Sequence, residues 1–265
     1  TSNPIYMIFY EAFGFFFQTF ILVKRKIKKL NLWLNFITFR RIKISLAIIK
    51  KYKDYSIYHN LVGLTTLASA SLQVIILSIN YSASETGLYS LALGMTSLPI
   101  QLVSLGTASV IYNQLVAIVS NSPHKLYRNS AKLTIAYMLI GFIPYLIIFL
   151  FGKSIFHIVF SSDWIVSGEL ASLIALPMYL QFCIYPVLSI FMVTDTIKIQ
   201  FRIDVFFSIT TTILLYIFST YFDLIRTIEL HSIALSSYRI TMLAYILHVS
   251  KKYSQNLKSI SAADK

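Results

Sequence analysis

Two ionisable residues lie in the middle of long apolar stretches. Arg239 is at the centre of "LHSIALSSYRITMLAYILHV", and Glu11 is near the centre of "PIYMIFYEAFGFFFQTFILV". A guanidinium can hold a phosphate through two parallel hydrogen bonds, so Arg239 is a candidate contact for an anionic substrate. Arg239 could instead form a buried ion pair or a polar bridge between helices. Glu11 could relay a proton or a cation, or it could serve helix packing.

Three further charged residues lie at the ends of predicted helices. Lys132 and Arg202 are candidate substrate contacts, and Asp204 is a candidate ion-coupling carboxylate. The alternative for all three is that they anchor helix ends at the membrane surface.

The sequence offers no pattern for a metal site, a cofactor or a catalytic centre. The five histidines are scattered, and the single cysteine, Cys183, cannot form a disulfide framework or a cysteine metal site. There is no nucleophile elbow, phosphate-binding loop or dinucleotide-binding fingerprint. We therefore expect no metal, no cofactor and no enzymatic activity.

The composition indicates that these residues are embedded in lipid. The chain has 265 residues, of which 57% are hydrophobic and 12% are charged, and its mean hydropathy is +0.71. Soluble domains carry about 25% charged residues. The net charge of +13 could suggest nucleic acid, but that function needs basic residues on a polar surface. We predict an all-α, polytopic membrane protein that does not bind nucleic acid.

Seven segments are long and apolar enough to cross a bilayer, which takes about 20 residues. They are residues 4–23, 57–79, 88–119, 133–151, 170–193, 205–222 and 230–249. The third would be ~48 Å long as a straight helix, against a hydrocarbon core of ~30 Å. It also contains Pro99, so we expect it to bend there, next to a cavity or a partner helix.

Basic residues predict the orientation and the domain organisation. Residues 24–56, 120–132, 194–203 and 250–265 hold 20 of the 23 lysines and arginines, which places these loops in the cytoplasm and the N-terminus of this chain in the periplasm. Residues 24–56 alone hold 11, interleaved with apolar residues at helical spacing, and they predict an amphipathic linker on the membrane surface. The alternative is that these residues are a simple topology anchor. It would separate one helix, 1–23, from a six-helix lobe, 57–249, and a cytoplasmic tail, 250–265.

Two blocks of the sequence resemble a known family. The first is "ETGLYSLALGMTSLPIQLVSLGTASVIYNQL", with Gly87, Tyr89 and Pro99 at its motif positions. The second is "FGKSIFHIVFSSDWIVSGELASLIALPMYLQFCIYPVLSIF", whose motif positions are Gly152, Trp164, Gly168 and Pro186. Both resemble Wzx-type O-antigen and polysaccharide flippases, which belong to the multidrug/oligosaccharidyl-lipid/polysaccharide exporters. The resemblance is good over roughly residues 50–200 and covers the C-terminal part of such a protein.

The resemblance implies a transporter of two six-helix lobes that takes part in lipopolysaccharide or other polysaccharide biosynthesis. Family members move undecaprenyl-diphosphate-linked sugar units across the bacterial inner membrane by alternating access. This chain would supply the last helix of the first lobe and the whole second lobe. Its partners would be the lipid-linked oligosaccharide, membrane lipids, the other lobe and polysaccharide polymerase or assembly proteins.

Three other interpretations stay open at this point. One is a drug or ion antiporter of the same superfamily, which a pocket rich in carboxylates would favour. Another is a membrane-embedded polysaccharide polymerase, which is expected to carry a large external catalytic loop. The longest external loop here, about residues 152–169, is short for that role. The last is a structural remnant without activity.

Overall fold

The computed structural model describes residue 17 and residues 39–263, and within these residues it contains no strand. The chain divides into two units, residues 1–53 and residues 54–265, and the features below belong to the second unit. The predicted helix 4–23 with Glu11, and the first part of the predicted linker, residues 24–38, lie outside the described residues apart from Phe17. The organisation predicted around that linker stays a prediction.

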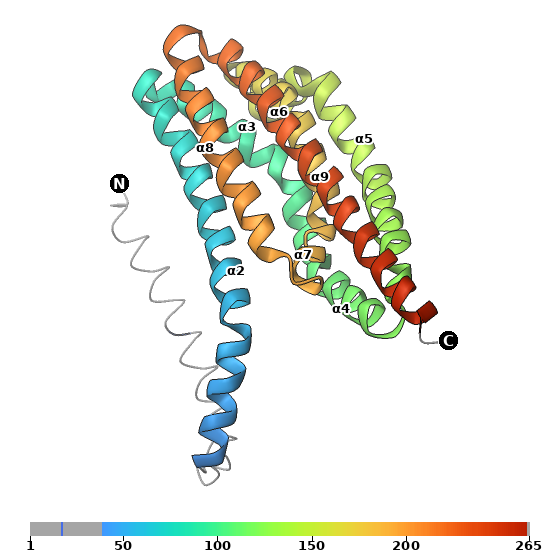
Figure 1. The fold of residues 1–265 in the computed structure, drawn as a ribbon. Helices are drawn as coiled ribbons and strands as arrows, with labels where there is room; N and C mark the ends of the chain where they lie inside the picture. Colours follow the sequence, from blue (N-terminus) through green and yellow to red (C-terminus); the bar gives the residue numbers. More distant parts are fainter. Residues whose placement is uncertain (1–16, 18–38, 264–265) are drawn as a thin grey trace. The chain divides into compact units, whose positions relative to one another are not determined.

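The described chain folds into helices joined by short turns (Figure 1). In chain order they are α2 (Phe39–Asn80), α3 (Ala83–Pro99), the π-helical turn η2 (Ile100–Leu105), α4 (Gly106–Asn121), η3 (Pro123–Lys125), α5 (Leu126–Phe160), η4 (Ser162–Trp164), α6 (Ile165–Ile184), η5 (Tyr185–Val187), α7 (Ile190–Val193), α8 (Ile197–Tyr221) and α9 (Leu224–Ala263). The predicted boundary between linker and lobe, at residues 56 and 57, falls inside α2.

Four stretches are long and apolar enough to cross a membrane: Tyr55–Asn80, Pro123–Phe160, Ser162–Val193 and Ile197–Tyr221, with mean hydropathies from 1.6 to 2.3. The bent pair Ala83–Ser104 and Gly106–Asn121 adds a fifth if it counts as one span. The predicted segment 230–249 lies within α9, which has 40 residues but is not among these apolar stretches. The prediction of an all-α, polytopic membrane protein is confirmed, whereas the count of seven spans stays a prediction.

Helix α3 begins and ends at residues that determine its length. Ser82 and Glu85 form a capping box: the Ser82 hydroxyl accepts from the Glu85 backbone N–H at 3.2 Å, and the Glu85 carboxylate accepts from the Ser82 N–H at 2.9 Å. At the other end, Pro99 lacks a backbone N–H and cannot complete the regular ladder. The chain continues as a π-helical turn, and the axis changes direction by 42° before α4. The predicted segment does bend, but the break lies between Ser104 and Gly106, beyond the π-helical turn, and not at Pro99 itself.

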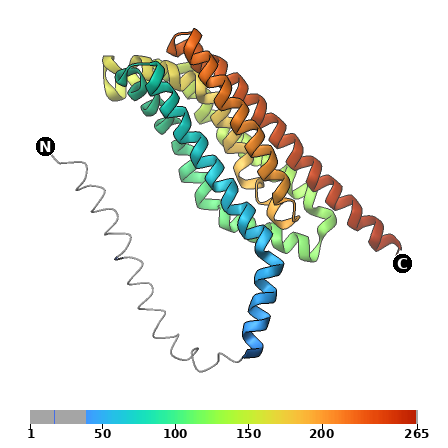
Figure 2. The ribbon, with the colours of Figure 1, turned by 60° about the vertical axis from the view of Figure 1, so that its left-hand side comes forward.

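Helix α6 is central, packing against α5, α9 and α3, as Figures 1 and 2 show. Its closest neighbour is α5, because Gly152 and Gly168 face each other. A Cβ on Gly152 would lie 2.4 Å from the Gly168 carbonyl oxygen, and a Cβ on Gly168 would lie 2.4 Å from the Gly152 carbonyl oxygen. Such contacts let two membrane helices approach at backbone distance. The Ser172 hydroxyl of α6 also links the two helices, because it donates to the Ile148 carbonyl of α5 at 3.0 Å.

Two apolar clusters form the interior. The first, which we call the Tyr137 core, includes Tyr137, Phe182, Phe191 and Tyr238. The second, the Leu170 core, contains Tyr89, Phe156, Leu170, Leu224 and other residues near one end of the helices. Much apolar surface stays exposed around them, for example Ile158 at 81% and Leu102 at 76%, as expected of helices that face lipid.

Candidate functional site

A buried polar cluster lies where α8 meets α9. The Asp204 carboxylate of α8 accepts a hydrogen bond from the Tyr238 hydroxyl of α9, and it also bonds with the side chain of Gln200 one turn earlier. Asp204 is 7% exposed, and Gln200 and Tyr238 are buried as well. Burying a carboxylate is costly unless hydrogen bonds compensate it, and this cluster supplies at least two.

Arg239 lies beside this cluster and reaches a third helix. Its guanidinium donates to the Gln181 side-chain oxygen of α6 at 3.0 Å. Its Cζ atom lies 4.6 Å from the centre of the Tyr238 ring, at cation–π distance, and it interacts electrostatically with Asp204. Arg239 is 15 residues into α9, ~22 Å from the start of that helix.

The guanidinium keeps most of its hydrogen-bonding capacity. Arginine has five N–H donors in a fixed fork, and within the described part of the chain Gln181 takes one of them. The Arg239 side chain is only partly buried. The remaining donors can therefore bind an anion in bidentate fashion, although Asp204 nearby already offsets part of the charge.

The other predicted site residues lie elsewhere. Lys132, on α5, and Arg202, on α8, are both exposed and contribute nothing to the polar cluster. Asp204 and Arg239 are thus the two predicted residues that the fold brings together. Their roles as ion-coupling and substrate-binding groups stay predictions.

The residues that carry the family resemblance lie at packing positions, helix ends and turns. Tyr89 is buried at 2%, and its hydroxyl donates to Gln73 of α2 at 3.2 Å. Gly87 is exposed in the first turn of α3, and Pro99 is its last residue. Trp164 closes the short turn before α6, and Pro186 is buried in the turn after it.

One face of α3 is polar and open, which the sequence reasoning missed. Gly87, Ser90, Gly94 and Ser97 of α3, together with Gln101 in the following turn η2, recur every three or four residues, and all but the half-buried Ser97 are exposed. A Cβ added at Gly87 or Gly94 would meet nothing within 4 Å. The Gln101 amide donates to the Ser97 hydroxyl at 2.9 Å. The Ser90 and Ser97 hydroxyls donate within α3, to the Thr86 and Gly94 carbonyls, each at 2.8 Å. The Gln101 amide has further hydrogen-bonding capacity that hydrocarbon cannot satisfy, so this face suits water or another protein surface. The recurrence of these small and polar residues every three or four positions was the signal in the sequence that could have revealed this face.

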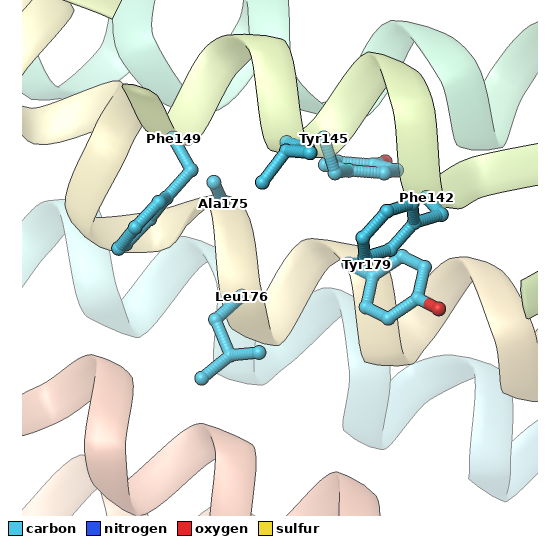
Figure 3. A pocket seen from close by; sticks show the side chains of 7 residues that line it. Phe142, Tyr145, Phe149, Ala175, Leu176 and Tyr179 are labelled. Carbon is cyan, nitrogen blue, oxygen red and sulfur yellow. The ribbon is translucent and has the colours of Figure 1, made fainter.

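An apolar groove opens between α5 and α6 (Figure 3). Phe142, Tyr145, Leu146 and Phe149 of α5 face Ala175, Leu176 and Tyr179 of α6 around a volume of about 220 Å³. Both tyrosine hydroxyls are used elsewhere: Tyr145 donates to the Thr96 carbonyl and Tyr179 to the Met138 carbonyl, each at 3.1 Å. The groove thus offers carbon surface and no free polar group.

In the described part of the chain no three His, Cys, Asp or Glu residues come together as a metal site would require. Cys183 is a buried free thiol in α6.

The chain matches a known protein family. The profile of a family described as "Polysaccharide biosynthesis protein" matches residues 17–169, more than half of the chain. No curated protein and no solved structure matches significantly.

Proposed function

Because the chain belongs to the polysaccharide biosynthesis protein family, we propose that it forms a six-helix lobe of a Wzx-type flippase. The transported molecule is an undecaprenyl-diphosphate-linked O-antigen or other oligosaccharide, moved across the bacterial inner membrane by alternating access. The observation that carries the proposal is Arg239, a partly buried residue in the middle of the predicted membrane segment 230–249, whose guanidinium retains free donors.

In this proposal Arg239 contacts the diphosphate, whose two negative charges suit a planar fork of N–H donors. The polar face of α3 provides a hydrated path for the sugar, because its small and hydroxylated side chains neither fill the space nor repel water. Lys132 and Arg202 contribute at the membrane surface, where they meet the diphosphate as it enters.

The carboxylate of Asp204 is the proposed ion-coupling group in this lobe, with Glu11 as a second. A proton or cation on Asp204 would compete with the Tyr238 hydrogen bond and so loosen the contact between α8 and α9. Rocking against a second lobe completes the transport cycle. No covalent bond changes in this process, so the protein is not an enzyme, and the basic loops face the cytoplasm.

A drug or ion antiporter of the same superfamily is the second candidate. The observation that favours it is Asp204 itself, because a buried carboxylate could bind a cationic solute directly. Arg239 beside it disfavours cations and supports the flippase.

The flippase proposal predicts the behaviour of Arg239 variants. In cells whose surface polysaccharide depends on this protein, Arg239→Ala should abolish export while the protein level stays normal. Arg239→Lys should retain part of the export, since an ammonium still attracts phosphate but cannot form the bidentate contact. The measurement is surface polysaccharide together with the lipid-linked precursor, which should accumulate inside the cell.

Arg226→Ala is the matched control, because Arg226 is an exposed arginine on the same helix, paired with Glu229. It should export normally. Normal export by Arg239→Ala would overturn the substrate role. A drop in folded protein that Asp204→Asn restores would show that Arg239 instead serves as a polar bridge.

A further inference from the structure

The end of the bundle where α4 turns into α5 is strongly basic. His124, Lys125 and Arg128 are all exposed there, on η3 and the first turn of α5. Sequence reasoning treats such residues only as markers of topology. Their surroundings give them a more specific role.

Helix α9 brings further cations to this turn. The Ser254 hydroxyl accepts from the Tyr127 backbone N–H at 3.0 Å and donates to the Pro123 carbonyl at 3.3 Å. Lys251 and Lys252 lie on the turn of α9 just before Ser254 and are exposed. The two hydrogen bonds hold these lysines at the same end of the bundle as Arg128.

No carboxylate lies along α4, η3, α5 or the C-terminal half of α9. The sequence has no acidic residue between Glu85 and Asp163, and none between Glu229 and Asp264. In the part of the chain that the structure describes, none of the five basic side chains forms an ion pair. An anionic ligand can therefore supply the missing counter-charge.

An apolar stripe leads away from Arg128 along α5. Lys132 follows Arg128 on one helix face, and after it come Ile135, Leu139, Phe142 and Leu146, at intervals of four, three, four, three and four residues, and all are exposed. Phe142 and Leu146 also line the groove between α5 and α6, as Figure 3 shows for Phe142. The stripe thus connects the basic end with the groove.

We propose that this face of α5 binds one anionic phospholipid. Its phosphate lies among Lys125, Arg128 and the α9 lysines, and one acyl chain follows the stripe into the groove. The lengths agree: Arg128 and Phe142 are 14 residues apart, ~21 Å along a helix. One leaflet measures about the same from the headgroup level to the bilayer centre, ~15 Å of hydrocarbon and ~6 Å of interface. The groove, without a free polar group, suits the end of the chain.

The headgroup part is tested by native mass spectrometry of the purified full chain in detergent. Titration with phosphatidylglycerol should give tighter binding than phosphatidylcholine with the same acyl chains. Arg128→Gln and Lys125→Gln should each weaken phosphatidylglycerol binding about fivefold, whereas Arg128→Lys should retain it. Lys153→Gln, an exposed lysine near the other end of α5, is the control and should change nothing.

The groove part is tested with chain length. Wild type should prefer phosphatidylglycerol with eighteen-carbon chains over the eight-carbon form. Leu146→Trp should fill the groove and remove this preference, whereas Ile158→Trp, on an 81% exposed position outside the groove, should keep it. Leu146→Phe replaces the tryptophan variant if that one is not monodisperse.

Several results would overturn the proposal. Equal binding of the two headgroups, or unchanged binding by Arg128→Gln, would refute the proposed phosphate site. Displacement of the lipid by millimolar inorganic phosphate would reduce it to a simple anion site. An unchanged chain-length preference in Leu146→Trp would refute the groove as the acyl site.

Discussion

At the scale of single residues, the molecule depends on two kinds of close contact: polar groups that satisfy one another inside a membrane helix bundle, and glycines that let backbones touch. Arg239, Tyr238 and Asp204 are the first kind, and their bonds join three helices. Gly152 and Gly168 are the second. The two kinds fail differently, because the loss of a polar partner leaves a charge unpaired, whereas a larger side chain forces backbones apart.

The glycine contact predicts a large loss of stability. In Gly152→Ala, the new methyl group would lie 2.3 Å from the Ser172 hydroxyl and 2.4 Å from the Gly168 carbonyl oxygen. The backbone atom cannot move aside, so we expect about 3 kcal/mol of destabilisation or more. Thermal unfolding in detergent and the yield of monodisperse protein measure it.

Gly94→Ala is the matched control, since a Cβ there meets nothing within 4 Å. Removing a mid-helix glycine should leave stability unchanged or raise it by up to ~1 kcal/mol. Equal stability of the Gly152 and Gly94 variants would mean that α5 and α6 can separate without cost.

At the scale of helices, several ends depend on residues from other elements. The first turn of α5 has backbone N–H groups without partners inside the helix. One of them, on Tyr127, donates to Ser254, which lies on α9 and 127 residues away in sequence. The C-terminal helix therefore caps another helix from outside, a connection that spacing in the sequence cannot reveal.

Ser254→Ala should weaken this cap. We expect a loss of about 1 kcal/mol, which corresponds to a drop of ~2–4 °C in melting temperature for a protein of this size. Ser237→Ala is the control, because the Ser237 hydroxyl is exposed and bonds within its own helix to the Ile233 carbonyl. An equal effect in both variants would argue against a capping role.

The bend between α3 and α4 makes a second prediction at this scale. Pro99→Ala restores a backbone N–H and removes the ring that crowds the preceding turn. The helix should straighten, and spin labels at the exposed positions Ser84 and Ser120 should move apart. The buried Cys183 should stay unlabelled.

Pro144→Ala provides the comparison, since Pro144 lies within the continuous α5. It should leave the distance between the labels unchanged. If Pro99→Ala also leaves it unchanged, the π-helical turn Ile100–Leu105 sets the bend without help from the proline.

Much of the helical architecture could be predicted from the sequence, because the long apolar runs and Pro99 act on the backbone of their own segment and need no distant partner. The predicted segment 170–193 was less regular than expected: α6 ends at Ile184, and a 3₁₀ turn with Pro186 precedes the short α7. The candidate site was harder to predict from the sequence. Arg239 and Asp204 are conspicuous as charges, but their hydrogen-bond partners are uncharged and distant in sequence: Gln181 is 58 residues from Arg239, and Tyr238 is 34 residues from Asp204. Only packing brings them together.

At the scale of the whole molecule, polar and apolar features are arranged along the bundle axis. Cations gather where η3, the start of α5 and the end of α9 meet, and the ion pair of Lys153 with Glu169 lies where α5 turns into α6. Between these ends, exposed apolar side chains cover most helix faces, and the polar face of α3 is an exception. One helix face thus differs from the lipid-facing surface, as the proposed transport path requires.

The contact between Gly152 and Gly168 also bears on how the protein enters the membrane. Helices α5 and α6 are joined by a turn of a few residues and meet at backbone distance close to that turn. Both are complete by Ile184, before α8 and α9 have been synthesised. The pair can therefore leave the translocation machinery together, already packed at the glycine contact. Later helices would then assemble on a hairpin that already exists, so a bulky residue at position 152 would disturb biogenesis as well as the finished protein.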